Sequence, residues 1–173
     1  MFVDKKSALF CHHPLLNVAF LILLSFFVAY LEVQIEGTHG WAASLPTWRQ
    51  KVGSSSFVLT GYHVAFWSTL LLMVHLPFLM VPWSGRLECF VLSFLFALLL
   101  LEDALWFFMN RRVHDDPWRQ PKVFNTVPYF FFLAASIVVA TAYFTRCRSW
   151  FISICGLMIL VLISYPFQIP TSS

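Results

Sequence analysis

The chain has 173 residues, of which 60% are hydrophobic and only 11% charged, and its mean hydropathy is +0.77. A water-soluble domain carries about 25% charged residues, so this composition excludes an ordinary soluble surface. It predicts an all-α, polytopic membrane protein of one domain. The net charge of +3 then belongs to the loops between spans and does not indicate nucleic-acid binding.

Several apolar runs approach or exceed the roughly 18 to 20 residues that a helix needs to cross a bilayer. The expected spans are roughly 15–35, 57–82, 87–109, 127–144 and 150–167. Pro77 should kink the second span, because proline lacks the backbone N–H and clashes with the preceding turn. We therefore expect one transmembrane helix bundle over residues 1–173 with about five spans, or four if 127–167 forms a single span.

Five spans place the two termini on opposite sides, and three span ends then bring ionisable residues to the side away from the N-terminus. The first span ends there with Glu32 and Glu36, which lie one turn apart on one helix face. The second begins there, with His63 about 9 Å inside it, and the third ends there, with Asp103 at a similar depth. We predict that Glu36, His63 and Asp103 approach each other.

Glu102 and Asp103 are adjacent within an apolar run, where a charge facing lipid costs at least about 2.5 to 3.5 kcal/mol. Adjacent side chains on a helix point about 100° apart, so the two carboxylates should have different partners. Asp103 shares a face with Asn110 and is expected to look into the bundle. Glu102 is expected to meet another helix or to be protonated.

Two polar segments lie on the same side as these carboxylates. Residues 35–56 contain Trp48 and Arg49, which fit either an aromatic belt with an arginine at the headgroups or a lid that binds a lipid headgroup. Residues 110–122 contain a triplet whose side chains suit a hard metal ion, although Asp-Asp-Pro is also typical of a turn. That weak metal candidate is His114, Asp115 and Asp116.

The ionisable set at this side admits three chemical interpretations, and the sequence leaves all three open. A metal centre is one, because carboxylates and imidazoles bind iron in helix bundles, although no Glu-x-x-His or His-x-x-x-His spacing lies within the expected spans. Metal-free acid–base catalysis is another, with a desolvated carboxylic acid donating a proton and a second group removing one. The third is structural, since buried polar pairs hold helices together with about 0.6 to 2 kcal/mol each.

Two stretches resemble known groups of membrane proteins. EGTHGWAASLPTWR (36–49), LTGYH (59–63) and HLPF (75–78) together resemble an uncharacterised group of small bacterial multi-span membrane proteins, which implies a bacterial envelope protein but no activity. LEDALWFFMN (101–110) looks locally like a stretch of integral-membrane lycopene cyclases, in which adjacent carboxylates carry out proton chemistry on a polyene. It departs from that pattern by having Asp103 where a second Glu is usual and by lacking a preceding proline.

The function expected from the sequence is a membrane-embedded enzyme that performs acid–base chemistry on a lipid or isoprenoid, in the bacterial inner membrane. The expected catalytic residues are Glu36, His63, Glu102 and Asp103. The expected substrate-binding residues are Arg49, Trp48, Tyr62, Trp106 and Asn110. The alternative is a non-enzymatic assembly factor, small transporter or partner subunit whose buried polar residues hold the helices together and which binds another membrane subunit.

Overall fold

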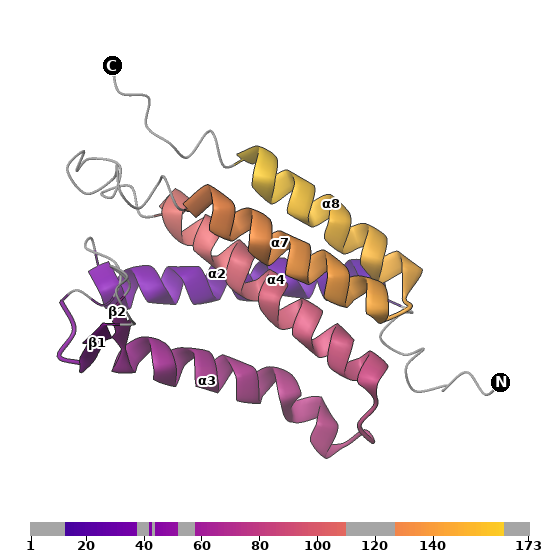
Figure 1. Cartoon of the computed structure of the whole chain (residues 1–173), viewed down its shortest axis with the longest axis horizontal. Coiled ribbons are helices and arrows are strands. Elements are labelled where there is room, and N and C mark those ends of the chain that lie inside the picture. Colours follow the sequence, from indigo (N-terminus) through magenta and orange to yellow (C-terminus); the bar gives the residue numbers. More distant parts are fainter. Residues whose placement is uncertain (1–12, 38–41, 43, 52–57, 110–126, 165–173) are drawn as a thin grey trace.

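The computed structural model describes residues 13–37, 42, 44–51, 58–109 and 127–164. The helices in these residues are α2 (Pro14–Glu36), α3 (Gly61–His75), α4 (Gly85–Met109), α7 (Val127–Phe144) and α8 (Arg148–Ser164). A 3-10 helix, η2 (Leu76–Leu79), follows α3, and two short strands, β1 (Arg49–Lys51) and β2 (Val58–Thr60), pair antiparallel. The all-α class is thus confirmed (Figure 1), with a small sheet that the sequence did not predict.

Three helical segments are long and apolar enough to cross a membrane: Pro14–Glu36, Gly61–Leu79 and Gly85–Trp106. The other two helices, α7 with 18 residues and α8 with 17, are also apolar but shorter. All five helices fall where apolar runs were found, and the predicted bounds of the fourth match those of α7. The runs locate the helices well because only a helix satisfies its backbone polar groups within such a run.

The start of the second helix was predicted wrongly. Residues 58–60 form β2, so α3 begins at Gly61 instead of near residue 57. His63 therefore lies in the first turn of α3, about 3 Å from its start, and not about 9 Å inside it. The interruption expected at Pro77 is present, because α3 ends at His75 and the chain continues as the tighter η2.

Helix α4 is central, since it contacts α2, α3, α7 and α8. Its buried face includes Leu98, which packs in one hydrophobic cluster with Leu21 of α2 and Ile154 of α8. Trp150 of α8 is fully buried, lies with its ring centroid 4.7 Å from that of Phe90, and donates from Nε1 to Ser93 Oγ at 2.8 Å. The indole N–H of Trp150 is therefore satisfied by a group on a neighbouring helix, as most buried polar groups are.

The order of the helices gathers four element ends at one end of the molecule (Figure 1, left). The last turns of α2, the sheet of β1 and β2, the first turn of α3 and the last turns of α4 lie there. The turn between α3 and α4 and the turn between α7 and α8 lie at the opposite end. The end of α2, the start of α3 and the end of α4 therefore share one end of the molecule, as the alternation of spans predicted.

Candidate functional site

Glu32 and Glu36 come from the last two turns of α2, and both are buried, with 7% and 3% of their surface exposed. Their spacing of four residues puts them on one face of the helix. On the other side of the same turns, the apolar side chains of Leu31 and Ile35 are exposed. The end of α2 thus directs its carboxylates inward and its hydrocarbon outward, which is the reverse of a helix end in water.

His63 is fixed in the first turn of α3 by Thr60. The Thr60 hydroxyl oxygen caps the helix by accepting from the His63 backbone N–H, and it lies 2.6 Å from His63 Nδ1. Both residues are buried, with 0% and 3% of their surface exposed. The cap and the ring contact together hold the imidazole in one orientation and leave its Nε2 pointing away from α3.

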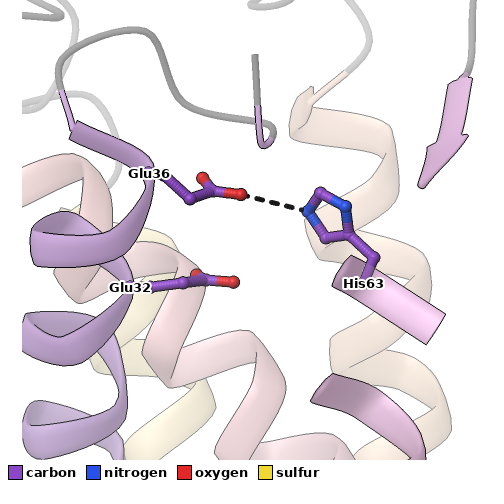
Figure 2. A group of neighbouring side chains, drawn as sticks. All are labelled: Glu32, Glu36 and His63. Carbon is purple, nitrogen blue, oxygen red and sulfur yellow. Dashed lines mark ion pairs between the residues drawn. The ribbon is translucent and has the colours of Figure 1, made fainter. Parts of the chain in front are cut away.

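Across the gap between the two helices, His63 Nε2 lies 3.3 Å from Glu36 Oε1 (Figure 2). Glu32 projects from α2 beside this pair, and one ligand-type atom from each of the three residues lies within 4.8 Å of the other two. Three ionisable side chains from two helices therefore converge on one small buried volume.

Helix α4 adds two more carboxylates to this end of the molecule. Glu102 is buried, with 3% of its surface exposed, and its carboxyl group interacts with that of Glu32. Its Oε1 is buried without a hydrogen-bond partner among the described residues. Asp103 is half-buried and interacts electrostatically with Glu32 and Glu36. Both carboxylates of α4 therefore interact with the end of α2, Glu102 with Glu32 and Asp103, for which the sequence predicted the inward face, with Glu32 and Glu36.

The segment between α2 and α3 braces the site. Ala42 N–H donates to Glu36 Oε1 at 2.7 Å, and Arg49 Nη2 donates to the Ala42 carbonyl, also at 2.7 Å. Arg49 is thus connected to the carboxylate cluster through one buried residue. Whether it also binds a lipid headgroup stays a prediction, tested below.

The same segment clamps the start of α3. Thr47 Oγ1 accepts from the Tyr62 backbone N–H at 3.0 Å, and the Trp48 carbonyl accepts from Gly61 N–H at 3.1 Å. A Cβ on Gly61 would lie 2.4 Å from Trp48 Nε1, so only glycine fits under this ring. The motifs LPTWR and LTGYH therefore form one interlocked unit that fixes His63 relative to Glu36.

The aromatic candidates lie around the cluster in different settings. Tyr62 packs edge-on against the His63 ring at 5.2 Å, and its buried hydroxyl has no hydrogen-bond partner among the residues that the structure describes. Trp106 of α4 is half-buried, whereas Trp48 is 56% exposed. Asn110 and the weak metal candidates His114, Asp115 and Asp116 lie outside the described residues.

A second Glu–His pair lies at the opposite end of the molecule and differs in its surroundings. His75 Nε2 lies 3.1 Å from Glu88 Oε1, and Trp83 Nε1 donates to Glu88 Oε2 at 2.9 Å. The His75 and Glu88 side chains are 28% and 25% exposed, against 3% and 4% for His63 and Glu36. This pair is a natural reference for experiments on the buried one.

Sequence reasoning left two contributors out of the expected catalytic set. Glu32 was one of the ionisable residues on the correct side, and its spacing of four residues from Glu36 was the signal that the two share a face. Thr60 was not considered, although a threonine three residues before His63 at a helix start is a typical N-cap.

Comparisons of the chain with protein-family models, curated proteins and solved structures find no match.

Proposed function

We propose that this protein is a membrane-embedded enzyme that performs acid–base chemistry on a lipid or isoprenoid. Its reaction centre is the carboxylate–histidine cluster, defined as Glu32, Glu36, His63, Glu102 and Asp103. The observation that carries the proposal is a buried Glu36–His63 pair beside a buried Glu102 with an oxygen that no described protein group satisfies. The proposal includes a bundle of five spans in the bacterial inner membrane, with membrane lipid as the partner.

The cluster holds more ionisable groups than helix packing needs. A single buried polar pair contributes about 0.6 to 2 kcal/mol to helix association, while each buried, unsatisfied polar group costs about 1 to 3 kcal/mol. Among the described residues, no Lys or Arg forms an ion pair with Glu32, Glu102 or Asp103. An arrangement that is expensive for stability and close to one end of the helices is typical of a functional site within a membrane.

The geometry suits proton transfer. His63 has neighbours at both ring nitrogens, Thr60 at Nδ1 and Glu36 at Nε2, so its orientation is fixed, as acid–base catalysis requires. Glu102 Oε1 has no hydrogen-bond partner among the described residues, so Glu102 is our first candidate for the proton donor. A proton added at one carbon and removed from another shifts a double bond, and this reaction balances without an oxidant or reductant.

The position of the cluster selects the class of substrate. The cluster lies at one end of α2, α3 and α4, while the outer faces of α2 and α3 expose large apolar side chains along their length. A substrate with a polar or unsaturated end at the cluster and a hydrocarbon tail along these helices fits this division. Lipids and isoprenoids have this amphiphilic or fully apolar character.

The five-span arrangement rests on the lengths of α7 and α8. At 1.5 Å per residue they measure about 27 and 26 Å, and a span of about 17 residues lies at the lower end of the usual range. Both helices pack against the membrane-length helix α4. Apolar helices that pack side by side, as these do, are what a membrane bundle requires.

A turnover experiment tests the enzyme proposal. Purified protein is reconstituted with a total lipid extract of bacterial membranes, and the lipid and isoprenoid species are followed by mass spectrometry over time. We expect one class of species to be converted by the wild type and by Glu88→Gln, which alters only the Glu–His pair at the opposite end. Glu102→Gln should fold and convert nothing. Full conversion by Glu102→Gln, or no conversion by the wild type, would contradict the proposal.

Asp103 is tested by two substitutions with opposite expectations. If Asp103 transfers a proton, Asp103→Asn keeps the fold and abolishes conversion. If it only holds helices together, Asp103→Asn is nearly silent and Asp103→Leu lowers the thermal stability in detergent. An Asn variant with full activity removes Asp103 from the catalytic residues.

The alternative function is that of a non-enzymatic membrane subunit, and one observation favours it. The hydrogen bond from Ala42 N–H to Glu36 and the hydrogen bond that Thr60 Oγ1 accepts from His63 N–H tie the segment between α2 and α3 to both helices, which is a structural role. In that case the Glu102→Gln variant changes stability alone, and the protein purifies from mild detergent with a second membrane subunit.

A further inference from the structure

We propose that Glu32, Glu36 and His63 bind one divalent transition-metal ion of the Zn²⁺, Mn²⁺ or Fe²⁺ type, next to Glu102. The inference concerns the same cluster as the proposed function and rests on that function only for the use of the ion in catalysis. Binding itself is argued from four observations: the spacing of the donor atoms, the hydrogen bonds behind them, the charge of the cluster and the unsatisfied oxygen of Glu102.

The donor atoms are spaced as the ligands of one ion are. Bonds of about 2.1 Å from His nitrogen and carboxylate oxygen to an ion, with the two atoms 3.3 Å apart as in His63 and Glu36, enclose an angle of about 105° at the ion, close to tetrahedral. Two ligands of one ion are at most about 4.2 Å apart. At the tetrahedral angle this separation is about 3.4 Å, so the distances here, all within 4.8 Å, close with shifts of at most about 0.7 Å per side chain.

The hydrogen bonds behind the donor atoms match those of metal ligands. A metal-binding histidine usually donates its second ring N–H to a fixed acceptor, and ligating carboxylates are themselves hydrogen-bonded. Thr60 Oγ1, 2.6 Å from His63 Nδ1, can accept that N–H and so leave Nε2 with its lone pair toward Glu36. Glu36 Oε1 accepts from the Ala42 N–H. His63 and Glu36 are thus each oriented by a hydrogen-bonding contact of their own, without an ion.

The charge of the cluster calls for a cation. Glu32 and Glu36, when ionised, would place two negative charges in a buried site, and a divalent ion neutralises two such charges beside a neutral imidazole. Glu102 contacts Glu32, and two carboxyl groups approach each other only with a proton or a cation between them. Glu102 Oε1, in a residue with 3% of its surface exposed, is the oxygen that lacks a described partner. It is therefore placed to serve as a further ligand or as the base for an ion-bound water.

The donor set indicates the class of ion. Mg²⁺ and Ca²⁺ take oxygen ligands almost exclusively, whereas imidazole favours zinc, iron and related transition metals. With the ion bound, Glu36 and His63 serve as ligands, and Glu102 and Asp103 are the groups that stay available for proton transfer. The His75–Glu88 pair offers two ligand atoms of these types, more exposed, and belongs to no such group of three in the described residues.

Cobalt is the probe for this site, because Co²⁺ replaces these ions and its visible absorption reports its ligands. Detergent-purified protein with its affinity tag removed is treated with chelator and titrated with Co²⁺. We expect one Co²⁺ per chain with visible ligand-field bands and a rise in thermal stability. Glu36→Gln and Glu32→Gln should weaken binding by about 100-fold or more, since even loss of an indirect supporting residue costs about 10- to 100-fold.

The matched control is Glu88→Gln, the same change in the exposed Glu–His pair, which should bind Co²⁺ like the wild type. His63→Gln should also lose the bands; if it does not fold, Glu32→Gln carries the test, since it keeps the histidine and its cap. Wild type without Co²⁺ bands and without a stability change at millimolar Co²⁺ overturns the proposal. Equal affinity of wild type and Glu36→Gln overturns it as well.

The outcomes separate this inference from the proposed function. Co²⁺ binding that depends on Glu32 and Glu36, with no lipid converted, supports the metal site and refutes the enzyme. Lipid conversion that persists after removal of metal, with no Co²⁺ binding, supports the enzyme and refutes the metal site.

Discussion

Thr60 is the residue whose replacement should affect the cluster most without altering any ionisable group. Its hydroxyl caps α3 by accepting from His63 N–H at 3.3 Å and contacts His63 Nδ1 at 2.6 Å, and its side chain is fully buried. Thr60→Val keeps the shape and removes both interactions. Loss of an N-cap costs about 1 kcal/mol, and leaving the buried imidazole nitrogen without a partner costs about 1 to 3 kcal/mol. The expected loss in the free energy of unfolding is therefore about 2 to 4 kcal/mol.

The measurement is reversible unfolding in mixed micelles of mild detergent and SDS, followed by circular dichroism. Thr60→Ser retains the hydroxyl and should recover most of the lost stability. Thr69→Val is the control on the same helix: its hydroxyl donates to the Ala65 carbonyl at an exposed position, so its effect should stay within about 0.5 kcal/mol. Thr60→Val with wild-type stability, or Thr60→Ser as unstable as Thr60→Val, would show that the hydroxyl does not hold His63.

Three further predictions concern other parts of the molecule. Trp150→Phe keeps a six-membered aromatic ring but removes the pyrrole ring, with its packing and its buried bond to Ser93. It should lower the free energy of unfolding by at least about 1 to 3 kcal/mol in the same micelle assay, and an unchanged value would contradict the pairing. Gly61→Ala should lower the thermal stability because its Cβ would lie 2.4 Å from Trp48 Nε1. In a Trp48→Ala background the same change should lower the thermal stability much less. Equal losses of thermal stability in both backgrounds would refute the clash. Arg49→Lys should weaken binding of anionic lipid more than it lowers stability, because lysine lacks the planar fork for phosphate. Unchanged lipid binding by this variant would mean that Arg49 contacts only the Ala42 carbonyl and bulk headgroups.

The sequence by itself determined the class of the fold and the place of the helices. Runs such as 127–144 are long and strongly apolar, and a helix satisfies its own backbone polar groups within such a run, so composition and length were sufficient. The alternation of the helices between the two ends then followed from short connections, and it put Glu36, His63 and Asp103 at one end before any contact was known.

The tertiary structure decided which of those residues meet. Glu102 and Asp103 are adjacent in sequence, and how deeply each is buried against its neighbours depends on a rotation of α4 that apolar residues all around the helix leave undetermined. The first turn of α3 was likewise set by pairing of β2 with β1 and by the fit of Gly61 beneath Trp48, contacts between residues seven to thirteen positions apart. The rise per residue gives the depth of a residue along a helix. The rotation of each helix about its axis, and the packing of the loops, depend on contacts with neighbouring segments. Those contacts placed Glu32 and Thr60 in the site.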